Sequence, residues 1–83
     1  MGLGTDLASA RALQTSLGTD GASSAIGADA THLVIDLSAQ VSALSADLAT
    51  AQTLKTSLTA DGANATVLAD VSALITDLTA FLS

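Results

Sequence analysis

Paired aspartates are the first residues in this sequence whose type and spacing could support chemistry. Asp29 and Asp36 are seven residues apart, and Asp70 and Asp77 repeat that spacing. Two carboxylates on one face of a helix could bind a cation or serve as a general acid and base. Seven residues of helix separate them by roughly 10 Å along the axis, however, which is too far for one shared site. We therefore expect both pairs to form solvated acidic surfaces.

Two Asp-Gly steps are a second candidate, because calcium loops combine carboxylates with glycine. They are Asp20-Gly21 and Asp61-Gly62. A calcium loop arranges several oxygen ligands around its glycine and closes with a bidentate Glu. Each step here supplies one carboxylate, and the sequence contains no Glu. We expect both steps to form short turns between helices.

Nucleophilic and metal chemistry have little support in the sequence. His32 is the single histidine and there is no cysteine, so neither a zinc site nor a catalytic triad can be assembled from the usual residues. The glycines match neither nucleotide-binding pattern. We predict that the protein is not an enzyme and takes no cofactor, metal or small-molecule ligand.

The charge balance argues against polyanionic partners. Eight Asp stand against Arg11 and Lys55, for a net charge of −6. Such a chain is repelled by phosphate backbones and by anionic membrane surfaces. Asp also interrupts every apolar stretch before the roughly 18 residues that a membrane span needs. We therefore expect neither nucleic acid nor a membrane as partner.

The segments that must position these residues occur twice, as an internal sequence repeat. Residues 6–39 and 47–80 share 17 of 34 residues when aligned 41 apart. The repeat copies apolar residues, turn residues and Asp, and it covers nearly the whole chain. We interpret residues 1–83 as a single helical domain with an internal repeat.

Composition and turn residues predict an all-α fold. The sequence has no proline, and Ala and Leu are strong helix formers. We predict a short helix over 5–20 with Thr5 as its N-cap, a long central helix over 24–60, and a helix over 65–82. Because the turns between them are short, neighbouring helices should be antiparallel. The predicted fold is a duplicated antiparallel αα-hairpin.

The apolar residues of the central segment step by four and three through the repeat boundary at 40–46, which predicts one continuous seam. Its members are Ala30, Val34, Leu37, Val41, Leu44, Leu48, Ala51, Leu54 and Leu58. The flanking helices show similar stripes, at Leu3, Leu7, Ala10, Leu13 and Leu17, and at Val67, Val71, Leu74, Leu78 and Phe81, with Ile75 and Leu82 widening the second. The alternative is a break near Ser45, which would give a four-helix up-down bundle.

In the long-helix arrangement, two helices cannot cover all the apolar residues. Leu33, Ile35, Leu68, Ile75 and Leu82 remain in addition to the seam, and leftover apolar surface predicts a partner. We expect that partner to be a second copy of the chain, a larger structural protein, or both. The predicted interface residues are Leu33, Val34, Leu37, Val41, Leu44, Leu48, Leu54, Leu58, Leu74, Ile75 and Leu78.

Several segments of the sequence resemble small Ala/Thr/Asp-rich helical structural proteins of tailed-phage virions. They are Asp6-Leu7 to Leu13, Asp47-Leu48 to Leu54, the turn from Thr59 to Asn64, and the segment from Asp70 to Leu78. The resemblance implies a multi-copy virion component attached to a capsid or tail. Without the virion setting, we expect a soluble protein. The alternative, indicated by the duplication and the small set of amino-acid types used, is a designed helical repeat without biological function.

Overall fold

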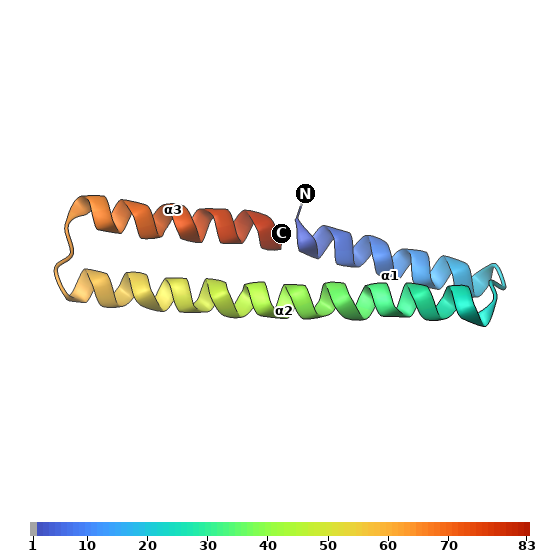
Figure 1. Cartoon of the computed structure of the whole chain (residues 1–83). Coiled ribbons are helices and arrows are strands. Elements are labelled where there is room, and N and C mark those ends of the chain that lie inside the picture. The colour runs from blue at the N-terminus through green and yellow to red at the C-terminus, as the bar shows by residue number, and fades with distance from the viewer. Residues whose placement is uncertain (1) are drawn as a thin grey trace.

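A computed structural model describes residues 2–83 as three α-helices joined by two short turns (Figure 1). Helix α1 spans Leu3–Thr19, α2 spans Ser24–Ala60 and α3 spans Ala65–Leu82. Helix α1 packs antiparallel on the first half of α2, and α3 packs antiparallel on the second half. The start of α1 and the end of α3 lie close together near the middle of the molecule (Figure 1). The result is a rod two helices thick, with Cα extents of 59 × 17 × 12 Å.

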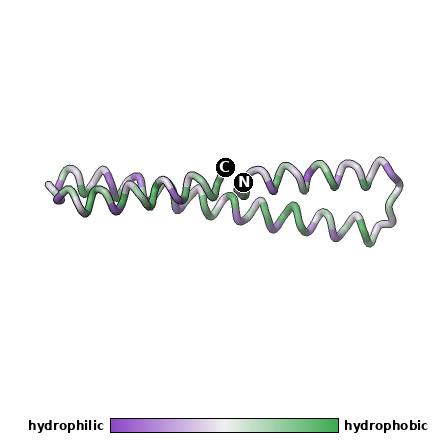
Figure 2. Tube along the Cα trace, turned by 90° about the horizontal axis from the view of Figure 1, so that it is seen from above, coloured by the Kyte–Doolittle hydropathy of each residue, from purple (hydrophilic) through white to green (hydrophobic). Residues whose placement is uncertain are grey.

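The two copies of the sequence repeat form the two halves of this rod. Helix α1 corresponds to the second half of α2, and the first half of α2 corresponds to α3. A half-turn about an axis perpendicular to the layer of helices therefore exchanges the halves (Figure 1). The layer also twists along its length, since from above the helix rows overlie each other at the α3 end and separate at the α1 end (Figure 2).

Both turns are closed by the same glycine motif, as predicted from the Asp-Gly steps. Gly21 and Gly62 have φ of 75° and 77°, the left-handed conformation that glycine adopts without strain. The amide of Ala22 donates to the Leu17 carbonyl at 3.0 Å, and the equivalent bond in the second turn is also 3.0 Å long. This pattern satisfies carbonyls that the end of a helix leaves free.

The helices that follow these turns begin with side-chain caps. Ser23 accepts a hydrogen bond from the Ile26 amide at 3.5 Å, and Asn64 Oδ1 accepts one from the Val67 amide at 3.0 Å. Ser and Asn are among the strongest N-cap residues because their side chains replace a missing backbone acceptor. The predicted ranges 24–60 and 65–82 agree with α2 and α3.

Helix α2 runs without a break past Ser45, so the four-helix alternative is wrong. Its seam continues through the middle, where Val41, Leu44 and Leu48 are all half-buried. Threonine hydroxyls within the helix donate to carbonyls four residues earlier, as Thr50 does to the Ala46 carbonyl at 3.1 Å.

The start of α1 differs from the prediction. The helix begins at Leu3 rather than at residue 5, and its N-cap, Gly2, offers no side-chain hydrogen bond. Thr5 lies in the first turn, and its hydroxyl donates instead to the Ser83 carbonyl at 3.0 Å. The physical reason is tertiary, because the first turn of α1 abuts the end of α3. A Cβ on Gly4 would lie 2.7 Å from the Leu82 carbonyl oxygen.

The core between the helices is thin. No side chain within residues 2–83 is completely buried, and three of the five buried apolar residues are alanines, which bury little area. The five are Leu7, Ala10, Ala30, Ala51 and Val71. Contacts within one chain therefore supply little hydrophobic stabilisation.

Candidate interaction face

The buried sides of the helices follow one heptad register, with positions labelled a to g and the seam at a and d. The seam rows are Leu3, Leu7, Ala10, Gln14 and Leu17 in α1, Ala30, Val34, Leu37, Val41, Leu44, Leu48, Ala51 and Leu58 in α2, and Leu68, Val71, Ile75, Leu78 and Leu82 in α3. The register survives the 41-residue repeat, so equivalent residues occupy the same heptad position in both halves.

Five residues predicted to lie in the seams are exposed instead. They are Leu13, Leu54, Val67, Leu74 and Phe81. In α3, two rows with three-four spacing pass through Val71 and Leu78, and spacing alone does not say which row faces α2. The structure turns Ile75 and its neighbours toward α2, because the rotation of the helix is fixed by packing against that helix.

A similar difference occurs in α1, where Gln14 occupies the seam in place of Leu13. The Gln14 amide donates to the Thr31 hydroxyl at 2.9 Å, and that hydroxyl donates to the Gly27 carbonyl at 3.0 Å. The polar group is accommodated because each member of this small network has a partner. Leu13 is left 49% exposed.

The exposed apolar side chains share a single heptad position. Within the described residues, eight large apolar residues are exposed, and seven of them occupy position g. The seven, named here the apolar face, are Leu13, Ile26, Leu33, Leu54, Val67, Leu74 and Phe81. The eighth is Ile35, at position b. The exposure is therefore systematic rather than scattered, which is the kind of surface that marks an interaction site.

These seven residues lie on the same side of the rod. Two antiparallel helices are related by a half-turn about an axis perpendicular to the plane that contains them. This rotation exchanges the two helices but keeps each broad side of the pair on the same side of that plane. Position g of α1, of α2 and of α3 therefore lies on one broad side, along the whole length of the molecule. The opposite side carries position e, which holds small or polar residues such as Thr31, Ser38, Gln52 and Ser72.

Polar or small residues border the apolar face at position c, next to g on the helix surface. Asp29 and Asp36 border the first half of α2, and Asp70 and Asp77 border α3. On α1 and the second half of α2, position c holds Ser9, Ser16, Ala43, Thr50 and Ser57. An apolar centre with a polar edge is the usual anatomy of a protein interface.

The predicted interface residues divide into two groups. Leu33, Leu54 and Leu74 lie on the apolar face. The other eight, Val34, Leu37, Val41, Leu44, Leu48, Leu58, Ile75 and Leu78, are half-buried in the seams between helices of the same chain. Sequence reasoning did not assign Leu13, Ile26, Val67 and Phe81 to the interface. The missed signal is an apolar stripe three positions wide in most heptads, which is typical of bundles with more than two helices.

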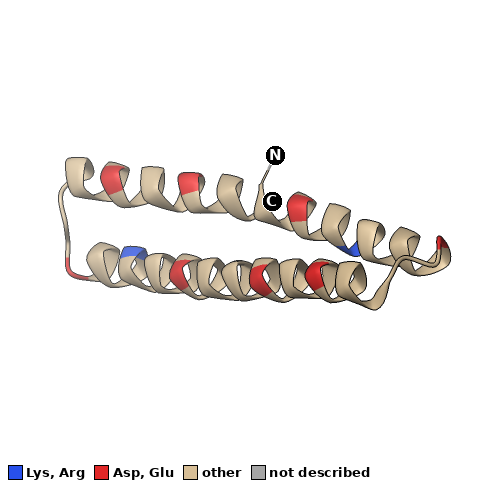
Figure 3. Cartoon of the chain, turned by 45° about the vertical axis from the view of Figure 1, so that its right-hand side comes forward, with Lys and Arg blue, Asp and Glu red and all other residues tan. Residues whose placement is uncertain are grey.

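The polar candidates do not converge on a site. The paired aspartates and His32 are exposed, and Asp20 and Asp61 follow α1 and α2 at the turns. Acidic residues are distributed along all three helices rather than gathered (Figure 3). Among residues 2–83, no three His or Asp side chains are grouped so as to hold a metal ion.

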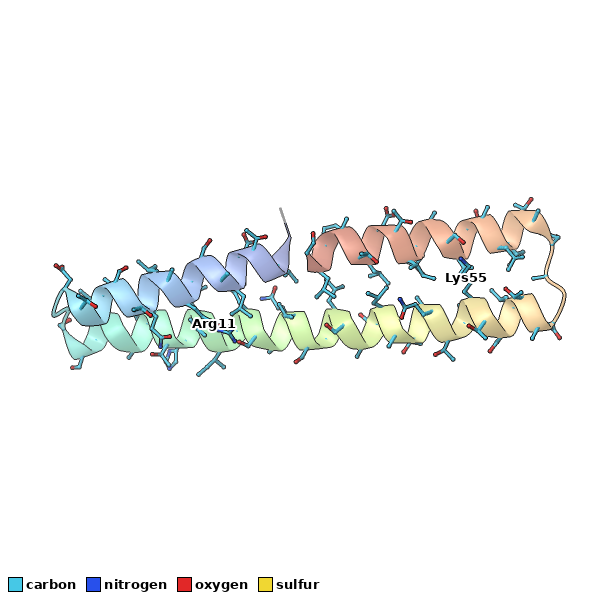
Figure 4. The ribbon with its side chains drawn as sticks, turned by 180° about the vertical axis from the view of Figure 1, so that it is seen from behind. Arg11 and Lys55 are labelled. Carbon is cyan, nitrogen blue, oxygen red and sulfur yellow. The ribbon has the colours of Figure 1, made fainter. Side chains whose placement is uncertain are left out.

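The two cations are exposed and occupy heptad positions other than g. Lys55 extends from α2 into the space beside α3, and Arg11 extends from α1 toward α2 (Figure 4). Lys55 takes position a of the seam, equivalent to Gln14 in the first half. Neither cation therefore interrupts the apolar face.

Helices α2 and α3 are each long and apolar enough, by length and composition alone, to cross a membrane. Little of either helix is buried in the structure. The Asp residues within them carry a cost, since an Asp at the centre of a spanning helix costs about 2.5–3.5 kcal/mol on insertion scales. Helix α3 holds two, Asp70 and Asp77, well inside its 18 residues.

Comparisons with known protein families, with curated proteins and with solved structures found no match to this chain.

Proposed function

We propose that the protein is a structural or assembly component that works by burying its apolar face against other helices. The observation that carries this proposal is the restriction of seven large, exposed apolar residues to heptad position g on one broad side of the rod. Scattered exposed leucines need no explanation, whereas large apolar residues gathered at one heptad position, with an acidic edge along the first half of α2 and along α3, do.

The thin core supports the same proposal. A compact domain of 83 residues has an expected radius of gyration of about 12 Å, whereas the value here is 18.2 Å. An extended rod with alanine-rich seams buries little apolar area by itself, and small domains need added stabilisation from association or cross-links. The chain has no cysteine to supply a cross-link.

Within this proposal, the setting is a virion, with many copies attached to a capsid or tail. The support for the setting is the resemblance of the Asp-Leu phrases to helical structural proteins of tailed phages. Mass spectrometry of purified particles from the source of the sequence tests it, and we expect the chain in many copies per particle. Its absence from such particles would remove the virion setting and leave the assembly function standing.

The assembly function is tested by diluting the full-length chain while following helicity and molecular mass. We expect helix content to fall on dilution, because the apolar face loses the partner that completes the core. A monodisperse, fully helical monomer at nanomolar concentration would contradict the proposal. If that monomer also melted above about 90 °C, it would favour the alternative of a designed helical repeat.

A membrane role is the second candidate, favoured by the length and apolar composition of α2 and α3. Its test is flotation of the chain with neutral phosphatidylcholine vesicles, which removes the repulsion that anionic lipid would add to a net charge of −6. Cofloating protein with protected α3 residues would support this candidate. We expect the protein to stay in the aqueous fraction, because insertion of α3 would bury Asp70 and Asp77.

A further inference from the structure

From the apolar face we infer that its occupant is a second copy of this chain, stacked face to face about a two-fold axis that lies in the plane of the interface. The inference deepens the proposed function and rests on it. The product would be a four-helix assembly as long as the rod, with the two apolar faces forming its central layer.

The exposed area suits a dimer of this kind. The chain exposes 5362 Å². A compact monomer of 8.1 kDa is expected to expose about 4,500 Å², so the excess is roughly 900 Å². A standard protein interface buries about 800 Å² from each partner. The Cα extents of 59 by 17 Å give the broad side a footprint of roughly 1,000 Å², enough for such an interface.

The chemistry of the face is self-complementary under an in-plane two-fold axis. The face consists of four helical segments, here called rows, and the half-turn that relates the two sequence repeats exchanges them in pairs. The rows are of two kinds. The first half of α2 and α3 carry Asp at position c, whereas α1 and the second half of α2 carry Ser, Thr or Ala there. A two-fold axis along the rod sets α1 over the partner's first half of α2, and one across the rod sets α1 over the partner's α3. Either axis therefore places acidic rows over uncharged rows.

In the middle of the face, too, either axis places acidic residues of one copy over uncharged residues of the other. Position g holds Asp6 and Asp47 in the uncharged-edged rows, and Gln40 and Phe81 at the equivalent places in the Asp-edged rows. Either in-plane axis sets each of these aspartates opposite Gln40 or Phe81 of the partner copy rather than opposite another aspartate. One heptad farther out on each side, Leu13 and Leu54 lie opposite Leu33 or Leu74 of the partner copy. A closed, two-fold interface of this kind uses one patch twice and is the commonest form of association.

The first test compares Leu33→Gln with Ile35→Gln by sedimentation equilibrium of the full chain from 1 to 500 μM. The Leu33 side chain is 45% exposed and the Ile35 side chain is 57% exposed, and both substitutions replace an apolar residue by a polar one. Residues two positions apart in the sequence differ by about 200° around the helix axis, so Ile35 points to nearly the opposite side of α2 from Leu33. We expect a wild-type dimer, at least a tenfold weaker dimer for Leu33→Gln and for its repeat equivalent Leu74→Gln, and an unchanged Kd for Ile35→Gln.

The second test probes the opposition of rows. Lysines replacing Ser16 and Ser57 lie, under either in-plane axis, near the partner's Asp29 and Asp70. We expect the double variant Ser16→Lys/Ser57→Lys to dimerise several-fold more tightly at low salt. That gain should disappear when Asp29 and Asp70 are also changed to Asn, which separates the effect between copies from pairing of the new lysines with Asp20 and Asp61 four residues on.

The outcomes separate this inference from the proposed function. A dimer that is insensitive to Leu33→Gln, or one that shows no coupling between the lysines and Asp29 or Asp70, overturns the stacking proposed here. A wild-type chain that stays monomeric and only partly helical also overturns it, yet leaves the assembly function in place with a different partner. A monomer that binds neutral vesicles overturns it in favour of the membrane candidate. A stable, fully helical monomer overturns both proposals.

Discussion

At the scale of single residues, the glycines of the two turns have a role that no other residue can fill without strain. Gly21 has a φ of 75°, and nothing lies within 4 Å of where its Cβ would be. Gly21→Ala should therefore destabilise the protein by about 1 kcal/mol through backbone strain alone. Urea unfolding at a fixed protein concentration measures this change.

Gly18 provides the matched control for that prediction. It lies three residues earlier, inside α1, with equally open space around its Cβ position and no positive φ. Gly18→Ala should stabilise the protein by as much as about 1 kcal/mol, because alanine is the better helix former. If both alanine variants changed stability in the same direction, the left-handed turn would not be the cause.

At the scale of the elements, the continuity of α2 holds the two halves together. A proline in the middle of a helix removes a hydrogen bond, clashes with the preceding turn and costs about 3 kcal/mol or more. Ser45→Pro should therefore lower helix content and stability, and change the radius of gyration from 18.2 Å. Circular dichroism and small-angle X-ray scattering measure the two effects.

Ser45→Ala is the control for the proline variant. Ser45 is exposed, so the alanine should leave the length and stability of the rod unchanged or slightly improved. A proline variant that matched this control in both measurements would mean that the halves are held together by contacts other than the continuous helix, such as the hydrogen bond from Thr5 to the Ser83 carbonyl.

At the scale of the whole molecule, charge opposes the association that the apolar face favours. Each chain carries a net charge of −6, and two copies repel each other. Raising the salt concentration from 10 to 500 mM should tighten self-association, because the Debye length falls from about 30 Å to a few ångströms. Sedimentation at both salt concentrations tests this. Weaker association at high salt would mean that attraction between opposite charges dominates the interface.

The sequence by itself determined the local features of this protein. Gly21, Gly62, Ser23 and Asn64 specify the turns and caps through backbone preferences that depend on a few neighbouring residues, so the bounds of α2 and α3 were predicted correctly. The uninterrupted seam also indicated that α2 continues past Ser45. These features are set by propensity and periodicity, which can be read along the chain.

Only the tertiary structure decided how each helix is rotated about its own axis. Val67 and Leu68 begin two rows of the same spacing, and packing against α2 buried the row of Leu68 and exposed that of Val67. The start of α1 was likewise moved to Leu3 by its contact with the end of α3. Both depend on residues distant in sequence. The apolar face is therefore a property of the assembled rod, because it consists of what the three helices leave uncovered once they are packed.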